Sequence, residues 1–277
     1  MTEKDSRQKR NKKNRKRNMI SNIILGIAIF VFIFSAYNLV SIYSEYHKGD
    51  KEYDSIEEAV IEIQTPKDEE TEKGEGETKP KIHVSLKVDF NKLKKTNKDI
   101  VGWIQFDEPK RINYPVVKGS DNDKYLKTTF EGKKNSAGTI FMDVVNAGDF
   151  SDRNTFIYGH NMKNGSMFGQ LRKFKAKDYY EQNPYFYIYT PDGKELKYQI
   201  FAVCIVEDTS RSYTRFYNSD EEYLDYLNYL KSIARYDTGV ELNAESKVVS
   251  LSTCTNVSET QRLLVHGVKI SETVVGE

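Results

Sequence analysis

The stretch SKVVSLSTCTNVSETQRLLVHGVKI, residues 246–270, contains two extended, mostly apolar runs separated by a short polar connection. The runs are rich in Val and Leu and too short for typical helices, so each predicts a β-strand. The connection TNVSETQ (255–261) is short enough to return the chain as an antiparallel neighbour. This hairpin would bring Arg262, at the start of the second strand, close to Cys254, at the end of the first.

Side-chain alternation along the first run separates an apolar face from a polar one. Successive side chains of a strand point to opposite faces, so Ser250, Ser252 and Cys254 share one face. The intervening apolar positions belong to the core, and the hydroxyl and thiol groups are therefore expected to face an open groove. The pattern predicts an accessible thiol at Cys254.

Other segments repeat the β pattern between turn signals. Further strands are predicted in NYPVV (113–117), GTIFMD (138–143), NTFIYGH (154–160) and the hairpin YFYIYTPDGKELKYQIFAVCIVE (185–207). One helix is predicted at 219–236, where Ser219 and Glu222 match a capping box and Leu224, Leu227 and Leu230 recur at helical spacing. A shorter helix is predicted at 90–103. The chain is therefore expected to be mainly β, as a barrel or sandwich with peripheral helices.

The amino-terminal region has the composition of a membrane anchor. Residues 1–18 carry nine Lys or Arg and two acidic residues, whereas the rest of the chain has 33 basic and 39 acidic residues. Residues 19–40 are uncharged, and a helix of that length spans about 30 Å, the thickness of the hydrocarbon core. The basic flank predicts a cytoplasmic tail and an exported body. A cleaved signal peptide is the alternative, but no A-x-A-like cleavage site follows.

The region after the anchor predicts a short helix and then a spacer. Ser55 and Glu58 form a second capping-box pattern before the apolar positions Ile56, Ala59, Val60 and Ile63. Residues 65–81 lack aliphatic and aromatic side chains, which is typical of a solvated spacer. The expected organisation is a cytoplasmic tail (1–18), a transmembrane anchor (19–44), an extracellular helix and linker (45–81) and a catalytic domain (82–277).

Charge and cysteine content exclude several classes of protein. The body has no basic stripe, which argues against nucleic-acid binding. The two cysteines, Cys204 and Cys254, stand in different contexts and are expected to be unpaired. Without a Cys-x-x-Cys or His/Cys cluster, we expect no metal and no organic cofactor.

A nucleophilic thiol needs a base or a cation nearby. Among four histidines, His160 is the candidate, because it follows a predicted strand and a glycine in TFIYGHNM. Strand-end loops commonly carry catalytic groups. Arg262 would add a fixed cation that stabilises an oxyanion.

Three motifs in this order, YGHNM, LSTC and a strand-opening arginine, resemble a sortase. The succession NYPVV, GTIFMD, TFIYGHNM, followed by a helix before the cysteine strand, is similar to class B in particular. The resemblance spans roughly residues 82–270. It implies an eight-stranded β-barrel whose seventh strand ends at the active-site cysteine.

The resemblance also implies a reaction. Cys254 would be the nucleophile, His160 the acid and base, and Arg262 the residue that stabilises the oxyanion or positions the substrate, with Ser252 and Tyr158 contacting substrate in the groove. Such an enzyme cleaves the carboxy-terminal sorting signal of secreted proteins, of the NPxTx or xPxTG type, after Thr. It holds the product as a thioacyl-enzyme and transfers it to an amine of the lipid-linked peptidoglycan precursor. The catalytic domain would face the cell wall from a single-pass anchor in the cell membrane.

Two other functions fit parts of the sequence. A papain-like cell-wall hydrolase also pairs cysteine with histidine, but its cysteine precedes the histidine and begins a helix. A non-catalytic anchored binding module would leave the Ser-Thr-Cys, Gly-His and Arg positions without a shared purpose.

Overall fold

The computed structural model describes residues 3–63, 83–255 and 257–275. The helices and strands of these ranges are α1 (Glu3–Val60), β1 (Ile61–Ile63), β2 (Leu86–Val88), α2 (Phe90–Thr96), β3 (Ile100–Gln105), β4 (Asn113–Val117), η1 (Lys124–Leu126), β5 (Ile140–Met142), β6 (Asn154–Tyr158), η2 (Gly169–Lys175), α3 (Lys177–Gln182), β7 (Tyr185–Tyr189), β8 (Lys194–Glu207), η3 (Arg211–Tyr213), α4 (Asp220–Ser232), β9 (Val248–Cys254) and β10 (Gln261–Val274). The predicted spacer at 65–81 lies outside the described residues.

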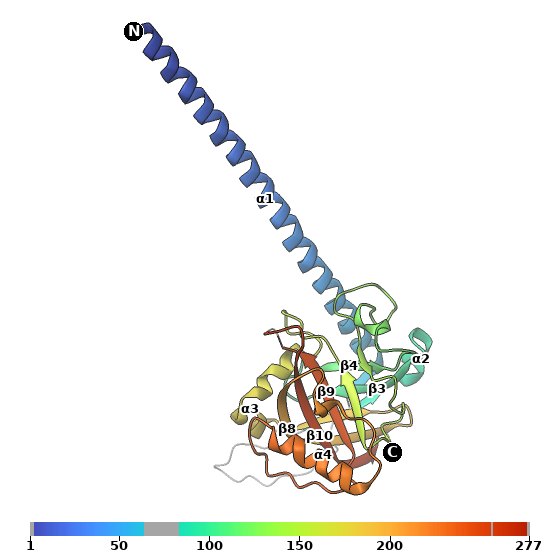
Figure 1. Ribbon diagram of the computed structural model, residues 1–277. Coiled ribbons are helices and arrows are strands. Elements are labelled where there is room, and N and C mark those ends of the chain that lie inside the picture. Colours follow the sequence, from blue (N-terminus) through green and yellow to red (C-terminus); the bar gives the residue numbers. More distant parts are fainter. Residues whose placement is uncertain (1–2, 64–82, 256, 276–277) are drawn as a thin grey trace, which may run out of the picture. The chain divides into compact units, whose positions relative to one another are not determined.

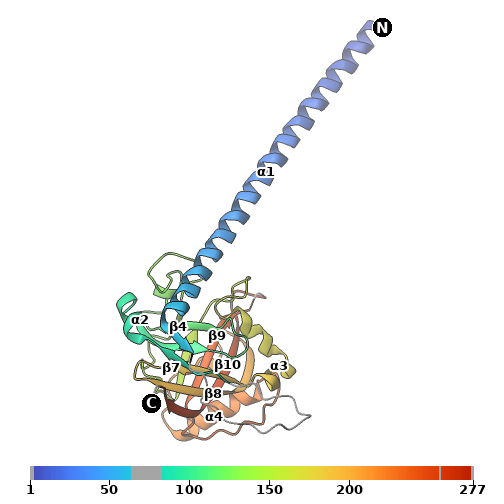
Figure 2. The same ribbon diagram turned by 180° about the vertical axis from the view of Figure 1, so that it is seen from behind.

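A closed barrel forms the body of the molecule (Figures 1 and 2). Within the described ranges its eight strands follow the order β10-β8-β7-β3-β4-β5-β6-β9. Two neighbouring pairs are parallel, β4 with β5 and β6 with β9, and the others are antiparallel. The expected eight-stranded barrel is confirmed, and β9 is the seventh of its strands along the chain.

Apolar side chains from all sides of the barrel fill its core. Val116, Ile140, Ile157, Leu251 and Val265, from five different strands, are completely buried. Each such side chain contributes roughly 1.5–3 kcal/mol when it leaves water. The strands that carry the candidate site therefore contribute directly to the packed core of the barrel.

Helix α4 packs on the outer side of β8, β9 and β10 (orange in Figure 1). Its start agrees with the prediction, since the Ser219 hydroxyl accepts a hydrogen bond from the Glu222 N–H at 3.1 Å. Leu227 and Leu230 are buried as expected. The face is rotated toward Tyr223 and Tyr226, whose large rings fill the space above the strands and leave Leu224 half-buried.

The helix predicted at 90–103 is wrong in its second half. Helix α2 stops at Thr96, Asn97 takes an extended conformation, and β3 begins at Ile100. Trp103 pairs with Pro115 of β4 and is completely buried. Burial of β-branched and aromatic side chains in the barrel outweighs the weak helical spacing of this segment.

The separate helix predicted after the anchor is also wrong, because α1 runs without interruption to Val60. Ser55 lies inside this helix and caps nothing. Ile56 and Val60 are buried as the apolar face predicted, but Ala59 is exposed. Ile63 is exposed as well, since it belongs to β1, which pairs with β2.

The chain divides by its contacts into two units, Met1–Lys48 and Gly49–Glu277. The first contains an apolar helical stretch that is long enough to cross a membrane, part of a candidate span Asn18–Val60. The second contains the barrel together with the last turns of α1. The predicted catalytic-domain start at residue 82 stays a prediction, and the observed division favours an earlier boundary.

The last turns of α1 are tied to the barrel unit by buried side chains. Tyr53, Ile56 and Val60 are each less than a tenth exposed. The Tyr53 hydroxyl donates to the Gly138 carbonyl at 2.5 Å, and the Asn113 side-chain amide donates to the Glu57 carboxylate at 2.7 Å. Removing this segment would uncover apolar surface and leave polar partners unpaired.

We therefore expect a chain that starts at residue 49 to be more stable than one that starts at residue 82. The chain that starts at residue 82 should have a free energy of unfolding lower by about 3 kcal/mol or more, which corresponds to a Tm lower by roughly 6–12 °C. Thermal unfolding of the two purified chains measures it. Equal melting temperatures would contradict the packing argument and support residue 82 as the boundary.

His83 joins the first described residues after the spacer region to the barrel wall. Its Nδ1 lies 2.8 Å from the Asp107 carboxylate and its Nε2 lies 3.2 Å from that of Glu195. The ring stacks on Tyr187 with centroids 3.4 Å apart. Burial alone would lower the pKa of His83, but the hydrogen bonds to the two carboxylates outweigh it and raise the pKa to about 9.

This raised pKa predicts a pH dependence of stability. The stabilisation from His83 is fully present below its unfolded pKa of about 6.5 and is lost as pH rises through about 9. We expect the free energy of unfolding to fall by roughly 1–2 kcal/mol across this window, after discounting for solvent screening. Urea unfolding between these pH values measures the slope, and the slope should be absent in His83→Gln. An equal slope in that variant would assign it to other groups.

Candidate active site

Three neighbouring strands bring the predicted catalytic residues to one end of the barrel. In the parallel β6–β9 pair Tyr158 lies opposite Ser252, so His160 follows β6 beside the end of β9. In the antiparallel β9–β10 pair Cys254 lies opposite Arg262. The register of these strands confirms the predicted hairpin.

Gly159, between β6 and His160, lies against the side chains of Ile140 and Phe168. A Cβ atom at this position would lie 2.4 Å from Ile140 Cδ1 and 2.7 Å from Phe168 Cδ2. Both contacts are far closer than packing permits, so only glycine fits here.

A pocket of about 260 Å³ opens beside Cys254. Its walls come from β5, β6, β9, β10 and the η1 segment. It is lined by all five residues that the sequence predicted, Cys254, His160, Arg262, Ser252 and Tyr158, and by Asn122, Leu126, Phe141, Gly159 and Thr253.

The two cysteines differ in the way that the sequence predicted. Both are free; Cys254 is exposed, whereas Cys204 is buried in β8. Burial raises the pKa of the Cys204 thiol to about 12, which keeps it protonated and unreactive. Cys254 is thus the accessible thiol of the chain.

His160 is held by a backbone carbonyl on the opposite wall. Its Nε2 lies 2.7 Å from the Leu126 oxygen. Because a carbonyl only accepts, Nε2 carries a proton, and in the neutral ring Nδ1 is free to accept one. Within the described residues no hydrogen bond joins the Cys254 thiol to the His160 ring, and both groups line the same pocket.

Arg262 is fixed at the rim of the pocket by three acceptors. One terminal nitrogen donates to the carbonyl oxygens of Glu259 and Gln261 at 2.5 and 3.2 Å. The other donates to the Asp208 carboxylate at 3.1 Å. The planar guanidinium keeps further N–H donors for a ligand, since it has five in all.

Ser252 and Tyr158 line the pocket, but their hydroxyl groups form hydrogen bonds with other side chains of the protein. Ser252 Oγ lies 2.7 Å from the Tyr213 hydroxyl. Tyr158 donates to the buried Asp143 at 2.7 Å, and Arg215 donates to the same carboxylate oxygen. The Tyr158 ring therefore faces the pocket while its hydroxyl belongs to a network behind the wall.

Sequence analysis missed this network. Burial would raise the pKa of Asp143, but hydrogen bonds from Tyr158, the Val145 N–H and Arg215 outweigh it and hold the pKa below its usual range. Asp143 ends the predicted strand GTIFMD, and a polar residue at a strand end could have been predicted to lie near the site. Arg215 lies on an irregular loop, where the sequence has no pattern that predicts a contact with the site.

The polar face of β9 is open only at its end, which corrects the prediction. Ser250 is completely buried, and its hydroxyl lies 2.7 Å from His266 Nδ1 and donates to Asn154 at 2.8 Å. Burial lowers the pKa of His266 to about 3, so this ring is neutral. The hydroxyl groups bond within the barrel wall, and Cys254 alone among the β9 residues is exposed.

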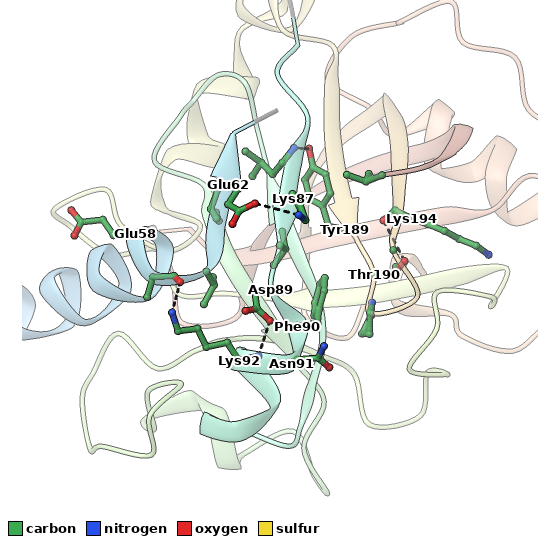
Figure 3. Close-up of a pocket in the computed structure, with 18 residues that line it drawn as sticks. Glu58, Glu62, Lys87, Asp89, Phe90, Asn91, Lys92, Tyr189, Thr190 and Lys194 are labelled. Atoms are coloured by element: carbon green, nitrogen blue, oxygen red, sulfur yellow. Dashed lines mark hydrogen bonds and ion pairs between the residues drawn. The ribbon is translucent and has the colours of Figure 1, made fainter. Parts of the chain in front are cut away.

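Among the described residues there is no group of three or more His, Cys, Asp or Glu side chains that could hold a metal ion. A second pocket of about 550 Å³ lies between the end of α1, the β1–β2 pair and the β7–β8 turn (Figure 3). Two of its lysines bond within its walls: Lys87 lies 3.3 Å from Glu62, and Lys92 donates to the Ala59 carbonyl at 2.8 Å. No cysteine, serine or histidine is among the described residues that line it.

Known proteins resemble this chain in sequence and in fold. The family described as the Sortase domain matches residues 106–270, which is more than half of the chain. The chain belongs to the sortase family. Sortases are cysteine transpeptidases that act on sorting-signal substrates and cell-wall amine acceptors.

The relatives place this sortase in class B. Sortase B of Listeria monocytogenes is 35% identical over 191 residues, covering 67% of this chain and 76% of the relative. Sortase B of Staphylococcus aureus is 29% identical over 254 residues, covering 91% and 95%. The crystal structure of sortase B from Bacillus anthracis in complex with AAEK1 has a TM-score of 0.68 and 30% identity, and covers 83% of this chain and 100% of that one.

Proposed function

We propose that this sortase cleaves the sorting signal of secreted proteins after Thr, with Cys254 as the nucleophile. His160 takes the thiol proton of Cys254, and the thiolate attacks the Thr carbonyl carbon, whose oxygen becomes an oxyanion. Collapse of this intermediate breaks the C–N bond, leaves a thioester on Cys254 and releases the downstream peptide as an amine. The observation that carries this proposal is the shared pocket of an exposed thiol, a histidine and a fixed arginine.

His160 moves the proton in both halves of the reaction. It donates a proton to the leaving amine during thioester formation. In the second half an acceptor amine attacks the thioester carbonyl, His160 takes the amine proton and the Cys254 thiolate leaves. The acceptor is proposed to be an amine of a lipid-linked peptidoglycan precursor.

Arg262 stabilises the oxyanion. Its charge is permanent and its position is held by Asp208 and two backbone carbonyls, so little reorganisation is needed during the reaction. Ser252 and the ring of Tyr158 form the floor that contacts the signal peptide. The form of the signal, NPxTx or xPxTG, follows from family resemblance alone.

The amino-terminal helix is proposed as a single-pass anchor. The basic residues of 1–18 favour a cytoplasmic tail, which puts the barrel on the cell-wall side. An exported substrate and a lipid-linked acceptor would then be confined to the same surface as the enzyme, which raises their effective concentration.

Internally quenched peptides with NPQTN-, LPxTG- and SPxTG-like signals test the function, with mass spectrometry of the enzyme. Cleavage of one peptide with a thioacyl adduct on Cys254 is expected. A folded protein that neither cleaves nor forms an adduct with any of them would contradict the proposal and favour a binding module.

A further inference from the structure

Asn161 makes a direct contact with the backbone of the proposed nucleophile. Its side-chain Nδ2 donates to the Cys254 carbonyl at 2.9 Å. Asn161 follows His160 directly in the chain. It therefore connects the two residues that the reaction must align, His160 and Cys254. The mechanism above assigns it no role.

The hydrogen-bonding pattern of β9 explains why the Cys254 carbonyl needs a partner from this side. The Thr255 N–H donates to the Gln261 carbonyl at 3.0 Å, so Cys254 and Arg262 face each other as a non-hydrogen-bonded pair. In such a pair the carbonyl of Cys254 points away from β10, toward β6. It must find its hydrogen bond there.

The backbone bonds of the β6–β9 ladder end before they reach the Cys254 carbonyl. The Gly159 N–H donates to the Ser252 carbonyl at 3.1 Å. In a parallel pair the next two rungs would run from the Cys254 N–H to the Gly159 carbonyl and from the Asn161 N–H to the Cys254 carbonyl, and neither bond is present among the described residues. Here the backbone has left the sheet, since Asn161 forms a bridge with Met167. The Asn161 side-chain amide takes the place of the second of these bonds.

The other end of the Asn161 amide supports this orientation. Its Oδ1 is buried and has no hydrogen-bond partner among the described residues. Turning the amide around would set its oxygen against the Cys254 carbonyl, which also only accepts.

We propose that Asn161 is a positioning residue whose side-chain amide replaces the last rung of the β6–β9 ladder. It holds the end of β9 at Cys254 while the backbone at His160 is free to turn into the pocket. The role rests on the proposed function, because it concerns the alignment of Cys254 with His160.

Two substitutions separate a hydrogen-bond donor from a space-filling side chain. Asn161→Asp keeps the shape but presents only acceptors to the Cys254 carbonyl, whereas Asn161→Ala removes the group. We expect both to lower kcat about 10- to 100-fold with KM within about twofold, and Asp to be no better than Ala. The exposed Lys163, in the same loop, supplies the control Lys163→Ala, which should keep wild-type kcat. Near-normal kcat in Asn161→Asp would overturn the proposal, as would a loss of kcat no greater than the loss of folded protein.

A spectroscopic measurement tests the contact without relying on activity. The chain contains two cysteines, so labelling with [1-¹³C]cysteine gives two carbonyl signals from the full chain in detergent micelles. The Cys254 signal should move in both Asn161 variants while the Cys204 signal stays. If wild-type protein cleaves no peptide, the proposed function fails, and this signal alone decides the contact. An unchanged Cys254 signal would overturn the positioning role whatever the activity.

Discussion

Replacing Cys254 by alanine is expected to abolish peptide cleavage and the thioacyl adduct, with kcat lower by at least about 10⁴-fold. The thioester cannot form without the sulfur, and no other described residue that lines the pocket is a comparable nucleophile. The fold should survive, because this side chain is exposed at the end of β9. Fluorogenic peptide cleavage and intact-protein mass spectrometry measure the two effects.

Cys204→Ala is the matched control for this experiment. It removes the buried thiol and should cost about 1–2 kcal/mol of stability through a small cavity. Activity per folded molecule and the adduct on Cys254 should persist, because Cys204 lies within β8. Substantial turnover by Cys254→Ala would show that Cys254 is not the nucleophile. An adduct on Cys204 would assign the role of nucleophile to Cys204 instead.

Arg262→Lys is expected to lower kcat about 10²–10³-fold, the usual effect of losing a preorganised oxyanion donor. The guanidinium bonds to Asp208 and two backbone carbonyls and still keeps donors for a substrate. An ammonium group is a point charge with three donors, and it cannot satisfy these acceptors and an oxyanion together. Steady-state kinetics on the best cleaved peptide measure the change, and KM should move less than kcat.

Arg211→Lys provides the matched substitution away from the pocket. Arg211 is exposed on η3 and pairs with Asp225, an interaction worth little at the surface. This variant should keep wild-type kinetics. Normal turnover by Arg262→Lys would show instead that Arg262 only ties the β9–β10 connection to Asp208.

Local patterns were sufficient to predict most of the barrel. The 185–207 hairpin and the β9–β10 hairpin were predicted where they occur, because alternating apolar residues and short turns specify both. The prediction for 90–103 was wrong in its second half, because the residues of β3, which pairs with β4, have helical spacing when the segment is considered alone. The prediction at Ser55 was also wrong, because a capping-box pattern can occur within a longer helix.

The candidate site was predicted to the extent that it lies at strand ends. Cys254, His160, Arg262, Ser252 and Tyr158 line one pocket, and their roles remain proposals. Groups that hold them were missed: Asp208 pairs with Arg262 across β8 and β10, and Arg215 reaches Asp143 from 72 positions along the chain. Contacts between distant segments leave no local pattern.

The sequence by itself determined the chemistry available to this protein: one thiol in a polar strand end, one histidine after a glycine, and an arginine that opens the last barrel strand. Short-range alternation and turn length are sufficient to specify these positions. Only the tertiary structure decided which groups meet, since parallel pairing of β6 with β9 depends on the closure of the whole barrel. That closure forms the pocket, buries Ser250 in the barrel wall and leaves Cys254 exposed. The packing of neighbouring strands around β9, rather than β9 alone, determines which of its residues contact water.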